Sequence, residues 1–368
     1  MSNAFVAAIP FELLGTIVIL PVQINGRALS FELDSGFETN TLDRTQATQL
    51  GLQLTDEQVV NAPGGSVEQS KAYEVALSLP GVKIPAQTMT VVPLGQFAPI
   101  FGHSVDGILG FDFFNRFVVE IDYEAQYLRL YNPEGYEYSG PGESIPISLV
   151  TRQPYLHANI VQLRRGTVRG RFELDTGSMD ALCMTSQFVD AHHLIPPDHP
   201  LLQLRGISLG GETLARLTRV QALQIGQFRI DWPVTGIVTE DVDRAGQISG
   251  EILRRFKVVF DYTRRRVILE KNRHFAEPFD FDRSGTFIIS EGPSFKVFKI
   301  VQVFQDSPAA EAGLHEGDVI KTIDGKPSVE FILNEIREMF KKGEQRYHLT
   351  VQRNHTEIQA EIQPRKLI

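Results

Sequence analysis

The chain of 368 residues contains a single cysteine, Cys183. One cysteine excludes an intramolecular disulfide and a cysteine-rich zinc site. Acidic residues outnumber basic ones by 45 to 36, so the positive excess typical of nucleic-acid-binding proteins is missing and no nucleic-acid partner is expected. Long apolar runs are also missing. The most apolar N-terminal stretch, residues 5–22, is interrupted by Pro10, Glu12 and Pro21, which predicts no membrane span.

Two kinds of active-site motif are absent as well. No Gly-x-Ser-x-Gly or Gly-Asn-Ser-Gly-Gly segment is present, which argues against a serine nucleophile. Histidine and cysteine show no regular ligand spacing, so neither a metal nor another cofactor is expected. With 42% hydrophobic and 22% charged residues, the composition is that of a globular protein, and the length predicts two or three domains.

The first 275 residues contain an internal repeat. Residues 31–36 read Phe-Glu-Leu-Asp-Ser-Gly, and residues 172–177 read Phe-Glu-Leu-Asp-Thr-Gly. Downstream, Ile108-Leu109-Gly110 is echoed by Ile248-Ser249-Gly250, and residues 118–123 are echoed by residues 258–262. Three matches in the same order predict a tandem duplication, with one lobe at 1–140 and a second at 141–275.

Both halves have the pattern of β-proteins. Residues 17–24 form a β-branched run, Asn25-Gly26 supplies a hairpin turn, and residues 28–33 continue as a strand. Short helices are expected at 43–50 and 186–193, just after the acidic motifs. Residues 132–145, rich in proline, glycine and serine, are expected to connect the halves.

The two acidic motifs have a definite chemical logic. A lone Asp-Ser-Gly or Asp-Thr-Gly is typical of a turn. Two copies related by a pseudo-twofold axis can bring Asp34 and Asp175 face to face, where they share one proton and activate water without a metal. Glycine leaves space beside each carboxylate, and the hydroxyl of Ser35 or Thr176 can bond to the opposing loop.

On these motifs, residues 10–275 resemble the retropepsin-like aspartyl proteases, with two lobes fused in one chain as in pepsin-like enzymes. The resemblance implies a mainly β, bilobed pair of acid-protease-like β-barrels with Asp34 and Asp175 as the catalytic acids. It also implies loop support and β-hairpin flaps over the cleft. The supporting residues are Ser35, Gly36, Gly110, Thr176, Gly177 and Gly250, and the candidate flap residues are Gly64, Gly65, Gly210 and Gly211.

The repeat ends near residue 275, and residues 276–368 are expected to form a third, small α+β domain. Residues 307–314 (Ser-Pro-Ala-Ala-Glu-Ala-Gly-Leu) and 317–320 (Gly-Asp-Val-Ile) resemble a bacterial PDZ domain, with a helix containing Phe331, Ile332, Ile336 and Phe340. Such a domain binds an extended peptide along a sheet edge. The resemblance implies a C-terminal peptide ligand and places its binding loop at Ser284, Gly285, Thr286 and Phe287.

These features predict an aspartic endopeptidase that acts on a peptide or protein substrate. The alternative is a peptide-binding adaptor that keeps the cleft but lacks turnover, because Phe37 follows the first acidic loop where the family usually has a small residue. The resemblance suggests a location outside the cytoplasm. If Met1-Ser2-Asn3-Ala4 is a cloning remnant, a native export signal has been trimmed from this sequence.

Overall fold

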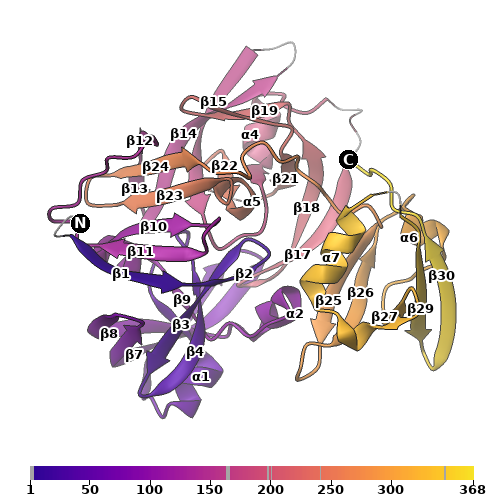
Figure 1. Cartoon of the computed structure of the whole chain (residues 1–368), viewed down its shortest axis with the longest axis horizontal. Helices are drawn as coiled ribbons and strands as arrows, with labels where there is room; N and C mark the ends of the chain where they lie inside the picture. The colour runs from indigo at the N-terminus through magenta and orange to yellow at the C-terminus, as the bar shows by residue number, and fades with distance from the viewer. Residues whose placement is uncertain (1–3, 163–165, 197–198, 200, 241, 344) are drawn as a thin grey trace.

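The computed structural model describes residues 4–162, 166–196, 199, 201–240, 242–343 and 345–368. The described chain is mainly β, as predicted. Two β-rich lobes lie against each other, and the C-terminal unit lies to one side of both (Figure 1). None of the described helices is both long and apolar enough to span a membrane.

The N-terminal lobe is built on one mixed sheet. β3 and β4 coincide closely with the two strands predicted around the Asn25-Gly26 turn. Within this sheet β4 runs parallel to β9, and β5 runs parallel to β8. The sheet order is β2 (Glu12–Leu14), β3 (Ile17–Ile24), β4 (Arg27–Leu33), β9 (Gly107–Leu109), β5 (Thr41–Asp43), β8 (Val82–Val92), β7 (Gly65–Leu79) and β6 (Leu54–Ala62).

The second lobe repeats this topology. β15 runs parallel to β22, and β16 runs parallel to β21, at the places equivalent to the two parallel pairs of the first lobe. The order is β14 (Gln153–Gln162), β15 (Gly166–Asp175), β22 (Gly246–Ser249), β16 (Leu182–Thr185), β21 (Val234–Val238), β18 (Gly211–Arg219) and β17 (Leu202–Ser208). β13 (Ser148–Val150), β19 (Ala222–Ile225) and β20 (Phe228–Asp231) extend the sheet beyond β14.

A third sheet joins the lobes. Its order is β1 (Phe5–Pro10), β11 (Tyr127–Tyr131), β10 (Val118–Asp122), β23 (Phe256–Asp261), β24 (Arg266–Lys271) and β12 (Glu143–Pro146). β10 and β23 come from different lobes and pair antiparallel, with Ile121 opposite Val258. The rings of Phe114 and Phe260 meet edge to face at 5.1 Å below this junction. The connector predicted at 132–145 is free of strand only as far as residue 142, because β12 pairs with β24.

The predicted short helices are present. α1 (Arg44–Gln49) begins after Asp43, whose carboxylate accepts hydrogen bonds from the backbone of Thr45 and Gln46. α4 (Ser186–Ala191) begins after Thr185, whose hydroxyl caps it in the same way. Four more short segments, η1 (Gly95–Phe97), α2 (Ala98–Phe101), α3 (Phe111–Arg116) and α5 (Gly250–Leu253), complete the lobes.

The C-terminal unit has its own apolar core. Its sheet order is β25 (Thr286–Glu291), β26 (Val297–Val303), β27 (Val319–Ile323), β29 (Tyr347–Arg353) and β30 (Thr356–Ile362), with β28 (Lys326–Pro327) beside β27. α6 (Pro308–Glu311), η2 (Ser328–Glu330) and α7 (Leu333–Lys341) pack on it. The prediction that Phe331 and Ile332 belong to the helix is wrong. The Glu335 carboxylate accepts from the Ile332 backbone at 2.8 Å, which makes Ile332 the cap.

Candidate active site

Each acidic loop leaves a strand that is flanked by a parallel neighbour. Asp34 follows β4 and Asp175 ends β15. The Gly36 N–H donates to Asp34 Oδ1 at 2.7 Å, and the Gly177 N–H donates to Asp175 Oδ1 at 2.9 Å. Each carboxylate is therefore oriented by the glycine of its own tight turn.

The two loops interlock through their hydroxyls. Ser35 Oγ donates to the Leu174 carbonyl at 2.7 Å and accepts from the Thr176 N–H at 3.1 Å. Thr176 Oγ1 donates to the Leu33 carbonyl at 2.8 Å and accepts from the Ser35 N–H at 2.9 Å. Both hydroxyls are fully buried, so this reciprocal network holds the two lobes in register at the acids.

The network brings the two carboxyl groups within hydrogen-bonding contact of each other. Burial and the charge of Asp175 raise the pKa of Asp34 well above its ordinary value. Burial raises the pKa of Asp175 to about 6. A Cβ at Gly36 would lie 3.1 Å from Asp175 Oδ1, and one at Gly177 would lie 2.7 Å from Asp34 Oδ1. Each glycine thus makes room for the acid of the opposite lobe.

Polar support of the two acids is unequal. Gln247 on β22 donates through Nε2 to Asp175 Oδ2 at 3.2 Å. The register places Gln247 opposite Glu173, whereas the equivalent Glu32 lies opposite the apolar Ile108. Asp34 therefore receives no hydrogen bond from a side-chain amide at the matching position of its own lobe, which is Ile108.

The two glutamates before the acids also differ. The Glu173 carboxylate contacts the guanidinium of Arg244, whose side chain is only 10% exposed. Glu32 is 4% exposed, and its Oε1 has no hydrogen-bond partner among the described residues. Burial, and then the charges of Asp34 and Asp175, raise the pKa of Glu32 well above its ordinary value. Glu32, Gln247 and Arg244 were not predicted from the sequence. The Glu repeated two residues before each Asp was a signal for Glu32, whereas Gln247 and Arg244 have no such signal.

The predicted supporting glycines both approach the loops, but they are not equivalent. A Cβ at Gly110 would lie 2.6 Å from the Phe37 carbonyl, and one at Gly250 would lie 2.6 Å from the Ser178 carbonyl. Leu109 pairs with Leu33 and Ile248 pairs with Leu174, so Gly110 corresponds to Ser249. The prediction that Gly110 and Gly250 are equivalent is therefore one residue out of register.

The candidate flap glycines meet at two hairpin tips. We call the β6–β7 hairpin flap 1 and the β17–β18 hairpin flap 2. The Gly210 N–H donates to the Pro63 carbonyl at 2.8 Å. A Cβ at Gly64 would lie 2.5 Å from the Gly211 carbonyl oxygen, and one at Gly65 would lie 2.7 Å from that of Gly210. The tips therefore pack backbone against backbone, which only glycine permits.

Phe37 packs into an apolar cluster between the first acidic loop and the flaps. Its partly buried side chain joins a cluster of buried residues that includes Ile17 and Val67, together with the partly buried Leu209 of flap 2. Its carbonyl accepts from the Phe111 N–H at 2.9 Å. The large ring is thus part of the wall under the flaps.

Two buried tyrosines occupy equivalent positions after β10 and β23. Neither hydroxyl, of Tyr123 or of Tyr262, has a hydrogen-bond partner among the described residues. Burial, and then the charge of Asp175, raise the pKa of Tyr123; burial, and then the charge of Asp34, raise that of Tyr262. Neutral phenols therefore line the region near the acids, and the repeat of the Asp-Tyr pair was their only sequence signal.

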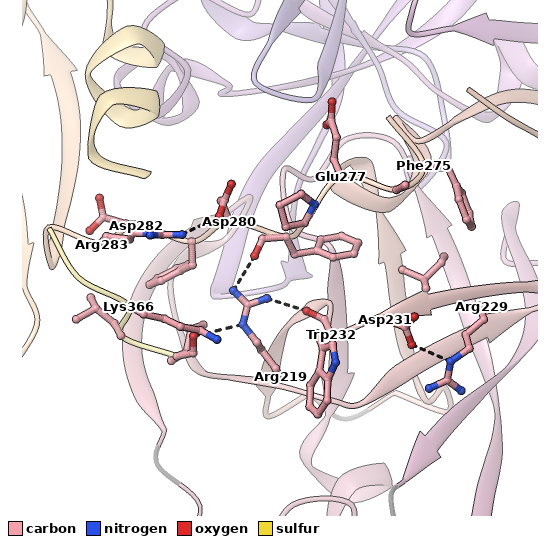
Figure 2. A pocket seen from close by; sticks show the side chains of 17 residues that line it. Arg219, Arg229, Asp231, Trp232, Phe275, Glu277, Asp280, Asp282, Arg283 and Lys366 are labelled. Atoms are coloured by element: carbon pink, nitrogen blue, oxygen red, sulfur yellow. Dashed lines mark hydrogen bonds and ion pairs between the residues drawn. The ribbon is translucent and has the colours of Figure 1, made fainter. Parts of the chain in front are cut away.

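A cavity of about 730 Å³ lies away from the acids, between the second lobe and the segment that leads to the C-terminal unit (Figure 2). Arg219 donates to the carbonyls of Trp232 and Phe279 at 2.7 Å each, and so ties the second lobe to this segment. The cavity contains none of the predicted site residues. Within the described ranges, no group of three or more His, Cys, Asp or Glu could hold a metal ion.

The predicted peptide-binding loop of the C-terminal unit is already engaged by a side chain of this protein. Asp282 Oδ1 accepts from the backbone of Gly285 at 2.7 Å and of Thr286 at 3.2 Å. The hydroxyl of Ser284 donates to the same carboxylate at 2.9 Å. Phe287 lies beneath the guanidinium of Arg337, 5.7 Å from its ring centre.

The unpartnered Glu32 gives a stability prediction. Because its pKa is raised in the folded state, its contribution to stability is present below its ordinary value of 4.5 and is lost as the pH rises through the raised value. Glu32→Gln cannot ionise, so this variant should lose less stability than the parent on going to alkaline pH. Melting temperatures across a pH series would measure the difference as several degrees at the alkaline end. The matched control is Glu57→Gln on the exposed face of flap 1. Equal pH slopes for the two variants would contradict the prediction.

Comparisons with known proteins agree with the two resemblances. Residues 20–113 match the family model for aspartyl protease, a range that includes Asp34, and residues 287–352 match the model for the PDZ domain. A probable periplasmic serine endoprotease DegP-like from Pseudomonas fulva (strain 12-X) is 28% identical over 122 residues, 33% of this chain and 22% of that protein. Serine protease HTRA1 from Xenopus tropicalis is 35% identical over 68 residues, 18% of this chain and 14% of that protein.

This chain therefore spans about a fifth or less of the length of these relatives. Both relatives are named as serine proteases and residues 20–113 match the aspartyl protease model, so the comparisons together support a protease in general terms. Residues 20–113 are therefore similar to aspartyl proteases, and residues 287–352 near the C-terminal end are similar to PDZ domains.

Proposed function

We propose that this protein is an aspartic endopeptidase in which Asp34 and Asp175 act on a peptide bond held under the two flaps. The reciprocal bonding of Ser35 and Thr176 carries the proposal, because it holds two acidic loops from different lobes face to face. A turn with only a structural role would not require a second acid within hydrogen-bonding contact.

The unequal surroundings of the two acids support different roles for them. Asp175 accepts from Gln247 and from its own loop glycine, which favours its ionised form. Asp34 lies near the buried Glu32 and beside the Asp175 charge, which favours its protonated form. In the resting state, the proton of the pair therefore resides on Asp34.

Hydrolysis then proceeds in two proton-coupled steps. Asp175 takes a proton from water as the water oxygen bonds to the peptide carbonyl carbon, while Asp34 donates its proton to the carbonyl oxygen. The resulting carbon carries two hydroxyl groups. Asp175 then gives its proton to the peptide nitrogen, the carbon–nitrogen bond breaks, and Asp34 regains a proton from one hydroxyl as the new carboxyl group forms.

The PDZ domain is proposed to bind peptide, either to recruit substrate or to control access to the cleft. A C-terminal peptide is the ligand expected from the sequence. The DegP-like relative is named as a probable periplasmic protease, which also supports a location outside the cytoplasm for this protein.

The function is tested by cleavage of a peptide library across acidic to alkaline pH, with products identified by mass spectrometry. The unmodified protein should cleave internal peptide bonds, and the same preparation of Asp34→Asn serves as the blank. Equal products in both samples, or none in either, would overturn the proposal. The second outcome would favour the non-cleaving adaptor predicted from Phe37.

The pH profile gives a further prediction. Activity needs Asp175 ionised and Asp34 protonated, so it should fall as the pH drops below about 6, the raised pKa of Asp175. It should fall again once the pH exceeds the raised pKa of Asp34.

Gln247→Leu removes a hydrogen-bond donor to ionised Asp175 and should move the acidic limb of the pH–rate profile up by about one pH unit. Initial rates measured at saturating peptide would show this shift. Gln224→Leu, at a half-buried glutamine of β19 that bonds the nearby Gly226 carbonyl, is the matched control. An acidic limb unchanged by Gln247→Leu would contradict the assignment of roles.

A further inference from the structure

The peptide groove of the PDZ domain faces another part of the same chain. β25 is the edge strand of its sheet, and α7 packs beside it. A PDZ domain adds its ligand along such an edge. Here α2 of the N-terminal lobe contacts β25 (Figure 1). We call residues 96–102, which contain α2, the plug segment.

Groove side chains bond the plug segment through its backbone. Arg337 of α7 donates to the Ile100 carbonyl at 2.8 Å and to the Ile288 carbonyl of β25 at 2.7 Å. Ser290 Oγ donates to the Pro99 carbonyl at 3.4 Å. A Cβ at Gly102 would lie 3.2 Å from Leu333 Cβ. These contacts are made to backbone carbonyls and apolar surface of the plug segment, and any apolar peptide of similar shape could supply both.

The groove does not require a free C-terminus in its ligand. The Gly285 and Thr286 amides are bonded to Asp282, so these two donors are already satisfied by an internal carboxylate. A second carboxylate brought to them would meet the charge of Asp282. The geometry therefore favours a stretch from within a polypeptide over a chain end.

The other side of the plug segment reaches the flaps. Phe97 and Phe101 stack at 6.1 Å between ring centres and pack into the cluster that contains Val67 of flap 1 and Leu209 of flap 2. Gln96 Nε2 donates to the Leu209 carbonyl at 3.2 Å. The plug segment thus connects the PDZ groove to the tip of flap 2.

Flap 2 is also held directly by the PDZ domain. The Arg205 N–H on β17 donates to Gln302 Oε1 at 3.0 Å, and Arg205 Nη2 donates to the Val301 carbonyl at 2.8 Å. Gln302 Nε2 donates to the Gln203 carbonyl at 2.6 Å. One domain therefore fixes the outer strand of flap 2 and, through the plug segment, its tip.

We propose that the plug segment is an internal ligand of the PDZ groove that holds flap 2 closed, and that an uncharged, apolar stretch of an unfolded polypeptide displaces it and frees the flap. The part of this inference that concerns control of access to the catalytic cleft rests on the proposed function. The coupling between groove and flap, however, is a property of the fold and is measurable without turnover.

The test uses the full chain carrying Asp34→Asn, so that no probe is consumed. The probe is a synthetic peptide with the sequence of residues 95–103, Gly-Gln-Phe-Ala-Pro-Ile-Phe-Gly-His. Hydrogen exchange of residues 202–219 and 96–102 should accelerate by about tenfold when the peptide is in excess. Arg337→Met should reproduce the acceleration without peptide. Arg346→Met, at an exposed ion pair of the same domain, is the matched control. Unchanged exchange of flap 2 in both the peptide and the Arg337→Met samples would overturn the inference.

A reversible cross-link supplies a second arm. Gly102→Cys with Ser290→Cys joins the plug segment to β25, since a Cβ at Gly102 lies 3.3 Å from Ser290 Oγ. The oxidised protein should show no response of flap 2 to peptide, and reduction should restore the response. Faster hydrogen exchange of flap 2 in the oxidised protein when peptide is added would contradict the inference. Coupling in these samples together with no cleavage by the unmodified protein would refute the peptidase proposal alone, and cleavage by the unmodified protein without coupling would refute this inference alone.

Discussion

Asp34→Asn and Asp175→Asn should each lower the rate of peptide cleavage by at least about 10²–10⁴-fold, the usual contribution of a positioned acid or base. The amide that Asp175→Asn introduces could not take a proton from water, whereas the amide that Asp34→Asn introduces could still donate to the substrate carbonyl. Asp175→Asn should therefore be the more damaging of the two. Initial rates on a peptide identified in the library screen measure the effect.

Loss of activity in these variants is informative only if the fold persists. The loops are held by Ser35 and Thr176, which neither substitution touches, so circular dichroism and the melting temperature should stay close to the parent values. Asp231→Asn, at an exposed position at the end of β20, is the matched control and should cleave as the parent does. Cleavage that survives either active-site substitution at the parent rate would remove the paired-acid mechanism.

Gly177→Ala should cost about 10²-fold or more in activity, the loss expected when a reacting group is displaced by about 1 Å. The added methyl group would collide with the Asp34 carboxyl group from across the lobe interface. Asp34 is the proposed proton donor, so a displacement of its carboxyl group by this methyl group would disturb the proposed reaction directly. The measurement is kcat and KM on the same peptide, with the loss expected in kcat.

The control for added volume is Gly95→Ala, where a Cβ meets nothing within 4 Å. Gly36→Ala, with a Cβ 3.1 Å from Asp175 Oδ1, should have a smaller effect of the same kind. If Gly177→Ala retained full kcat, Asp34 would have room to move without consequence, and its proposed donation of a proton to substrate would be wrong.

Much of the framework of strands and helices can be predicted from local sequence patterns. The β-branched run at 17–24 and the Asn25-Gly26 turn predicted β3 and β4, because these residues favour a strand and a tight hairpin. The short helices predicted at 43–50 and 186–193 are present as α1 and α4, which the side chains of Asp43 and Thr185 cap. The recurrence of Phe-Glu-Leu-Asp indicated the second acidic loop, which the family match over residues 20–113 does not reach.

Other features depend on how distant segments pack. Glu32 and Glu173 stand in nearly the same local sequence, yet only Glu173 contacts an arginine. Its partner Arg244 lies 71 positions further along the chain, and strand register also places Gln247 beside Glu173. The one-residue shift between Gly110 and Gly250 also arises from strand pairing, which sequence matching cannot measure.

The sequence by itself determined the β class, the duplicated acids, the glycines of both flaps and the PDZ pattern, because each depends on residue types a few positions apart. Tertiary structure alone decided which acid carries polar support and what lies against the PDZ groove. Both are contacts between residues far apart in the sequence. Gln247 acquires its role from strand register within the second lobe, and Pro99 and Ile100 acquire theirs from the docking of α2 against β25. Such contacts are set by the packing of whole surfaces, which no local pattern encodes.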